Sequence, residues 1–126
     1  MLVLATDGVW DNLSAQDILG IVSAEMDAAG AWSVSDDGGS GVSKKLVDLM
    51  QSHHGGGKQE GLHVRVAQTV TKAAKEASLS RTRDGPFARE VQRRYPQENW
   101  KGGKADDICV VVAIAVDGGR PASPVE

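Results

Sequence analysis

The stretch LVLATDGVWD, at residues 2–11, decides the fold that this sequence predicts. Its opening apolar run, at residues 2–6, is too short for a helix and is typical of a buried strand. The run leads directly into Asp7. A second predicted strand, at residues 107–116, lies near the other end of the chain and directly follows Asp106. If the two strands lie side by side in one sheet, their acidic ends meet at its rim.

The chemistry of such a meeting point favours a cation. Carboxylates repel one another unless a positive charge lies between them, and hard oxygen ligands select Mg²⁺ or Mn²⁺. The alternative for Asp7 and Asp106 is a structural one, in which each carboxylate caps a nearby helix or turn. The sequence pattern alone leaves both interpretations open.

Helices are predicted between the two strands. Ser14 and Asp17 form a capping-box pattern in front of the first helix. A Pro in the first turn, Pro86, favours a short last helix in which Phe87 and Val91 would be buried. Residues 30–40 are predicted to be a loop. The predicted helices cover residues 15–28, 42–52 and 61–79, and a short segment from Pro86 to Tyr95.

This order of elements predicts an α+β fold that is incomplete. Two strands do not make a stable independent sheet, so the long apolar runs imply further strands beside them and helices covering one face. We expect residues 1–116 to form part of a domain and residues 117–126 to be a flexible tail. A strand that begins at residue 1 suggests the back half of a longer protein, with exposed strand edges that favour self-association.

Composition excludes some function classes. The 126 residues carry a formal net charge of −3, which argues against a general nucleic-acid binder. No apolar stretch approaches the ~20 residues that cross a bilayer, so no membrane partner is expected. The single cysteine, Cys109, excludes a disulfide within the chain and is predicted to be a small buried hydrophobe.

Both ends of the chain resemble the protein phosphatase 2C family, the metal-dependent Ser/Thr phosphatases. Residues 2–11 contain the LATDGVWD element of that family, and GKADDICVVV at residues 103–112 resembles its closing strand. Gly-Pro-Phe-Ala at residues 85–88, followed by Gly-Gly-Lys at 102–104, is similar to the "SPFA…GGK.DDIT" ending of a subclass that includes mitochondrial phosphatases.

The resemblance implies a fold and a set of site residues. The fold would be a fragment of an α-β-β-α sandwich, in which two antiparallel sheets are flanked by helices. Asp7 and Asp106 would ligate a metal, and Asp11 would lie near a weaker third metal position. Asp107, where many members carry Asn, and Gly8 would support these ligands without binding the metal themselves.

The resemblance also implies an activity. Two Mg²⁺ or Mn²⁺ ions in the complete domain would activate a water that hydrolyses phosphoserine or phosphothreonine in a phosphoprotein substrate. The family's Asp-Gly-x-Gly-Gly motif and phosphate-binding arginine are missing, and Asp37-Gly38-Gly39 comes too late in the chain to replace them. We therefore expect the amino-terminal half of the catalytic domain as a partner, and no activity from this chain alone.

Two alternatives remain at this stage: a non-catalytic phosphatase-like binding module, and a truncated gene product. The compartment also stays open, since an intracellular location, cytosolic or mitochondrial, fits the subclass. Trp10 is predicted to be a core anchor behind Asp7. His53, His54 and residues 55–58 are predicted to form a solvated connector. An arginine cluster is predicted to line an exposed helix face; it comprises Arg81, Arg83, Arg89, Arg93 and Arg94.

Overall fold

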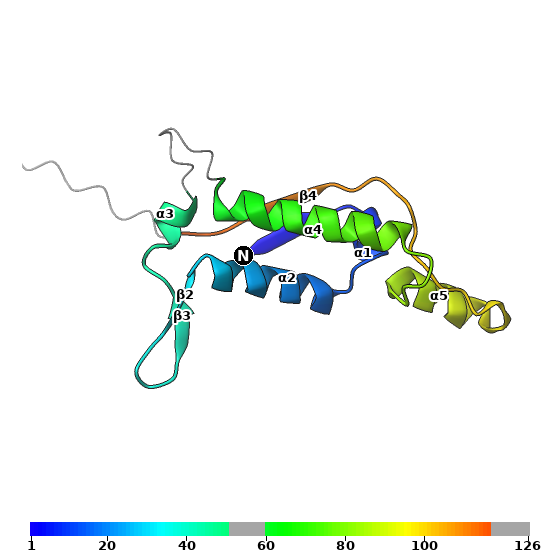
Figure 1. Cartoon of the computed structure of the whole chain (residues 1–126), viewed down its shortest axis with the longest axis horizontal. Coiled ribbons are helices and arrows are strands. Elements are labelled where there is room, and N and C mark those ends of the chain that lie inside the picture. Colours follow the sequence, from blue (N-terminus) through cyan, green and yellow to red (C-terminus); the bar gives the residue numbers. More distant parts are fainter. Residues whose placement is uncertain (51–59, 117–126) are drawn as a thin grey trace, which may run out of the picture.

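The computed structural model describes residues 1–50 and 60–116 and confirms the α+β class (Figure 1). The predictions for residues 51–59 and 117–126, which include the connector, His53, His54 and the tail, lie outside the described residues. The elements in chain order are β1 (Leu2–Ala5), α1 (Asp7–Trp10), α2 (Ala15–Ala28), β2 (Trp32–Val34), β3 (Ser40–Val42), α3 (Leu46–Met50), α4 (Leu62–Leu79), α5 (Pro86–Arg94), a 3₁₀ turn (Pro96–Glu98) and β4 (Val110–Ala113).

The first and last strands are hydrogen-bonded neighbours, as predicted. β1 and β4 pair antiparallel, with Leu2 opposite Ala113 and Ala5 opposite Val110. The last strand is shorter than the predicted 107–116, because its partner β1 offers only four residues to pair with. The pairing joins segments that are about a hundred residues apart in sequence.

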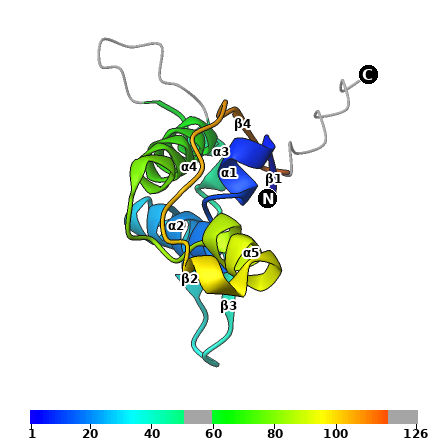
Figure 2. The same ribbon diagram turned by 90° about the vertical axis from the view of Figure 1, so that its right-hand side faces the viewer.

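Two helices cover one face of this two-stranded sheet. Figure 2 shows α2 and α4 on one side of the molecule and the β1–β4 pair on the other. Apolar side chains at helical spacing face the core: Ile18 and Met26 of α2 are buried, as are Val66 and Val70 of α4. Among the described residues, no helix is long and apolar enough to span a membrane.

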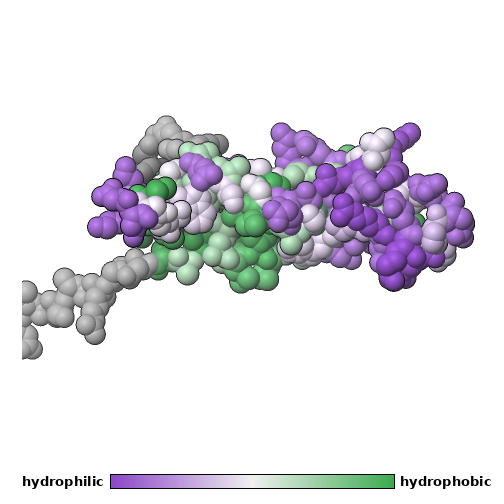
Figure 3. Space-filling view, turned by 90° about the horizontal axis from the view of Figure 1, so that it is seen from below, coloured by the Kyte–Doolittle hydropathy of each residue, from purple (hydrophilic) through white to green (hydrophobic). Residues whose placement is uncertain are grey.

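The opposite face of the sheet is open, so the prediction of buried strands is wrong for one of their two faces. Side chains alternate along a strand, and Val112 packs into the core while its neighbour Val111 is 55% exposed. Leu2 and Leu4 are similarly exposed. Cys109 lies two residues before Val111, on the same outward side of the extended chain, and is also exposed, so its predicted burial is wrong. Figure 3 shows hydrophobic side chains gathered on one side of the molecule. We call Leu2, Leu4, Cys109, Val111 and Ala113 the outer face.

The predicted capping box is confirmed at the start of α2. The Ser14 hydroxyl accepts a hydrogen bond from the Asp17 amide (3.1 Å), and the Asp17 carboxylate accepts one from the Ser14 amide (2.8 Å). Arg83 adds an ion pair to the same carboxylate at 3.0 Å. These contacts fix the direction in which the chain enters α2 after the α1 turn.

The predicted loop at residues 30–40 is partly wrong, because it contains strand β2 and the start of β3. They form a hairpin in which Trp32 lies opposite Val42 and Val34 opposite Ser40. The turn between them follows from the sequence: Asp37 accepts a hydrogen bond from the Gly39 amide, and Gly38 has a positive φ of 80°. The hairpin projects from one end of the molecule in Figure 1.

The last helix, α5, begins at Pro86 as predicted. Ala88 is its fully buried residue, while Phe87 and Val91 are half-buried. Arg93 and Arg94 at the end of α5 are exposed, as expected, and Glu90 accepts hydrogen bonds from both. These two guanidinium groups lower the pKa of Glu90 to about 2. The predicted arginine face is wrong for Arg81 and Arg83, which lie before the helix.

Candidate metal centre

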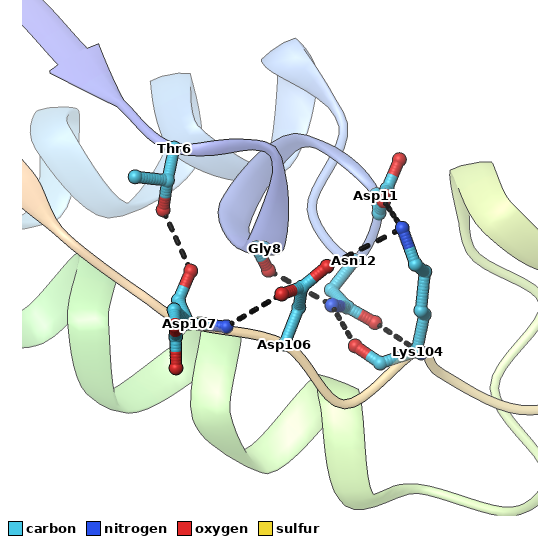
Figure 4. A network of polar contacts seen from close by, with 7 residues as sticks. All are labelled: Thr6, Gly8, Asp11, Asn12, Lys104, Asp106 and Asp107. Atoms are coloured by element: carbon cyan, nitrogen blue, oxygen red, sulfur yellow. Dashed lines mark hydrogen bonds and ion pairs between the residues drawn. The ribbon is translucent and has the colours of Figure 1, made fainter.

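The end of β1 is joined to the segment before β4 by a single threonine. The Thr6 amide donates to the Cys109 carbonyl (3.1 Å), and the Thr6 hydroxyl donates to the Asp107 carbonyl (2.8 Å). The same hydroxyl accepts from the Cys109 amide (3.1 Å). Thr6 therefore extends the β1–β4 contact to the point where the aspartates begin (Figure 4).

The α1 turn approaches the opposite segment closely, and this requires glycine at position 8. A β-carbon added to Gly8 would lie 2.4 Å from the Asp107 carbonyl oxygen, well inside van der Waals contact. Gly8 is itself buried, so an added side chain would force the two segments apart. The absence of a side chain at Gly8 therefore sets how near Asp7 comes to Asp106.

A buried amide, Asn12, locks the same two segments together one turn later. Its side chain is 1% exposed. Its Nδ2 donates to the carbonyls of Gly8 and Lys104, both at 2.8 Å, and its Oδ1 accepts from the Lys104 amide at 2.9 Å. Because buried polar groups need partners, this network fixes α1 and the Lys104 backbone relative to one another.

The outcome is a cluster of three carboxylates. Asp7, Asp11 and Asp106 each have an oxygen within 4.8 Å of the other two. Asp7 and Asp106 are exposed and Asp11 is half-buried, so the cluster faces solvent. The structure thus brings together the three residues that the sequence analysis singled out as metal ligands.

The charge of this cluster is partly balanced by Lys104. Its ammonium lies 2.7 Å from Asp11 Oδ2 and 3.4 Å from Asp106 Oδ2. The hydrogen bond to Asp11, followed by that to Asp106, raises the pKa of Lys104. The pKa of Asp106 is lowered, first by a hydrogen bond from the Asp107 amide (2.8 Å) and then by Lys104.

The donor set fits a hard divalent cation. Three carboxylates from two chain segments offer oxygen ligands at an open rim, and Mg²⁺-type ions retain several waters beside a few carboxylates. Asp7, Asp11 and Asp106 would hold the ion. Asp107 contributes through its backbone, since its carbonyl binds Thr6 and its amide binds Asp106. Gly8 contributes by having no side chain.

Sequence reasoning missed the residues that hold the cluster in place. It assigned neither Asn12 nor Lys104 a role in the site. One signal was available for Asn12: it lies three residues after Val9 and directly before Leu13, and both are buried. At helical spacing an amide there falls on the buried face, where it must find partners.

The prediction that Trp10 anchors the core is wrong. The side chain is 40% exposed, and its indole nitrogen donates to the Ala5 carbonyl at 3.0 Å. Trp10 thus stabilises the turn after β1 by a hydrogen bond from the surface. Val9, which is fully buried, takes the core position in its place.

Comparison with known proteins agrees with this geometry. Residues 1–56 match the family model described as Protein phosphatase 2C. No curated protein and no solved structure matches the chain significantly. The matched segment includes β1, α1 and two of the three clustered carboxylates, Asp7 and Asp11. Residues 1–56 are therefore similar to part of a protein phosphatase 2C domain.

Proposed function

We propose that this chain is the carboxy-terminal portion of a metal-dependent protein Ser/Thr phosphatase that hydrolyses phosphoserine or phosphothreonine in phosphoproteins. The observation that carries the proposal is the antiparallel pairing of β1 with β4, which gathers Asp7, Asp11 and Asp106 within 4.8 Å. The family match over residues 1–56 supports the same activity. The mitochondrial subclass suggested by residues 85–88 and 102–104 stays a prediction.

The roles proposed for the residues follow from their positions. Asp7 and Asp106 hold Mg²⁺ or Mn²⁺, and Asp11 serves a weaker position on the side of Lys104. When bound, a pair of such ions supplies a water of lowered pKa and neutralises charge on the phosphoryl oxygens. Thr6, Gly8 and Asn12 keep the carboxylates at the separation that this requires, through the contacts described above.

We further propose that the amino-terminal half of the domain is the main partner of this chain. The outer face supports this, since an apolar sheet face of this kind normally packs against another layer. Leu2, Leu4 and Val111 are each more than half exposed. Without that layer, the chain is expected to self-associate through the outer face and to hydrolyse no phosphate ester on its own.

The test is Mn²⁺-dependent hydrolysis of p-nitrophenyl phosphate. The 126-residue chain is expected to be inactive, and a protein extended by the sequence upstream of Met1 is expected to be active. In the extended protein, Asp7→Asn or Asp106→Asn should reduce turnover by more than about 100-fold, since changes around a metal already cost 10–100-fold. Asp48→Asn, an exposed carboxylate in α3, is the control.

Two results would contradict the proposal. Robust turnover by the 126-residue chain would mean that the amino-terminal half is not needed. An extended protein that folds and binds phosphopeptide but hydrolyses nothing would favour the alternative of a non-catalytic binding module.

A further inference from the structure

Lys104 is held rigidly at the rim of the carboxylate cluster. Asn12 binds both its amide (2.9 Å) and its carbonyl (2.8 Å), so its backbone cannot move independently of α1. Figure 4 shows its side chain running from this anchored backbone toward Asp11. Phe87 borders the other side, with its ring centroid 5.9 Å from the Lys104 ammonium.

The three carboxylates are not equivalent toward this lysine. Asp11 is in direct contact at 2.7 Å, and Asp106 is further away at 3.4 Å. Among the residues that the structure describes, Asp7 forms no ion pair. The ammonium therefore occupies the Asp11 side of the cluster and leaves the Asp7 side open to a second cation.

We propose that Lys104 is a resident counter-ion that competes with divalent metal for Asp11 and Asp106. This inference rests on the proposed function and goes beyond it. The ammonium offsets the repulsion between Asp11 and Asp106 in the metal-free protein. It also repels a divalent cation a few ångströms away, so binding is weaker than the three carboxylates would otherwise give. Lys104 thus acts as a positioning residue that sets the metal affinity of the site.

The size of the effect follows from Coulomb's law. A single and a double positive charge about 5 Å apart in a water-like dielectric repel by an energy equivalent to roughly tenfold in affinity. The Lys104 side chain is 38% exposed, so solvent and salt screen this repulsion. We therefore expect an effect of about tenfold at low ionic strength that shrinks as salt is added.

A set of matched variants separates charge from packing. Lys104→Met keeps the aliphatic length beside Phe87 and removes the charge, while Lys104→Arg keeps the charge. Lys101→Met is the control, since Lys101 pairs with Asp84 at 3.0 Å on the exposed surface and contacts none of the three clustered carboxylates. Lys104→Gln replaces Lys104→Met if circular dichroism shows that the methionine variant does not fold.

The experiment measures Mn²⁺ binding to the 126-residue chain by isothermal titration calorimetry and by the loss of the free-Mn²⁺ electron paramagnetic resonance signal. Lys104→Met should bind Mn²⁺ about tenfold more tightly than the unchanged chain at low salt. Lys104→Arg and Lys101→Met should stay within about twofold of the unchanged chain. Adding Asp106→Asn to Lys104→Met should abolish this gain in Mn²⁺ affinity.

The outcomes separate this inference from the proposed function. Equal or weaker binding by Lys104→Met overturns the competition, while the phosphatase assignment stands if Asp7→Asn still abolishes binding. Binding by Lys104→Met alone, with none by the unchanged chain, supports the competition in its strongest form. If neither protein binds Mn²⁺ at millimolar concentration, the competition is overturned, and turnover by the extended protein decides the function separately.

Discussion

The Asn12 side chain binds both polar groups of the Lys104 peptide, donating to its carbonyl at 2.8 Å and accepting from its amide at 2.9 Å. A side-chain amide used in this way imitates a strand partner, because it satisfies a donor and an acceptor of one residue together. It does so beyond the end of the β1–β4 ladder, where no regular pairing is left. Asn12 therefore continues the connection between the two ends of the chain as far as the carboxylates.

Replacement of Asn12 should be costly. Asn12→Ala would leave the Gly8 and Lys104 carbonyls and the Lys104 amide without their partner, at an expected cost of about 2–3 kcal/mol in unfolding free energy. Urea unfolding followed by circular dichroism measures this. Asn12→Asp has nearly the same shape but cannot donate, so it should also destabilise. Gln68→Ala, on the exposed side of α4, should change little. A loss below 0.5 kcal/mol for Asn12→Ala, which is the range of ordinary surface changes, would contradict the bridging role.

A pair of glycines should respond to alanine in opposite directions. Gly8→Ala places a methyl group against the Asp107 carbonyl, only 2.4 Å away. This should destabilise the chain by about 3 kcal/mol and weaken Mn²⁺ binding, because α1 must move away from Asp106. Gly20→Ala, in the middle of α2 with nothing within 4 Å, should stabilise it by about 0.5–1 kcal/mol. Thermal unfolding compares the two, and shifts in the same direction would refute the steric argument.

The capping box should make stability depend on acidity. The pKa of Asp17 lies below its ordinary value of 3.8. The largest causes are hydrogen bonds from the Ser14 hydroxyl and then from the Ser14 amide, followed by the positive charge of Arg83. Such a carboxylate contributes stability that is fully present above its unfolded-state pKa. That contribution disappears as the pH falls through the lower pKa of the folded state.

Asp17→Asn should therefore lower the free energy of unfolding by about 1 kcal/mol at pH 7, and by progressively less as the pH falls below 3.8. The measurement is the urea midpoint of both proteins across that range. Asp27→Asn, near the other end of α2 and exposed, serves as the comparison for loss of a carboxylate outside the box. If the difference in urea midpoint between Asp17→Asn and the unchanged chain stays constant with pH, the capping contacts do not depend on the charge of Asp17.

The outer face should govern self-association without governing stability. Leu4 is 56% exposed, so Leu4→Lys should change the unfolding free energy by less than about 0.5 kcal/mol. It should nevertheless lower the fraction of oligomer seen by analytical ultracentrifugation. Val112→Thr, on the inner side of the same sheet at 9% exposure, should instead cost about 1–2 kcal/mol. A monomeric unchanged chain at high concentration would remove the outer face as an association surface.

The parts of the fold that sequence predicted well are those with a local or periodic signal. The capping box at Ser14 and Asp17 marks the start of α2, which spans residues 15–28 as predicted. The start of α5 follows from Pro86. The hairpin β2–β3 was missed because three-residue strands with exposed side chains carry no burial pattern.

The candidate site divides in the same way. Asp7 and Asp11 were found because they lie in one contiguous motif, and Asp106 because it lies in a second one at the other end of the chain. The contacts of Asn12 and Lys104 join residues 92 positions apart, and no local pattern specifies such a pair. The exposure of Cys109 was missed for a related reason: an apolar run does not reveal which of its two faces will be covered.

The register of the sheet brings the two ends of the described fold to one place. Leu2 pairs with Ala113, so β1 begins where β4 finishes. Circular permutation is tolerated where termini lie close together at the surface. A short glycine linker could therefore join the last residues of β4 to Met1, with new termini opened at Gly38 and Gly39 in the exposed hairpin turn. In such a rearranged polypeptide Asp106 would precede Asp7 within one continuous segment. Both carboxylates would then lie in a single β-hairpin.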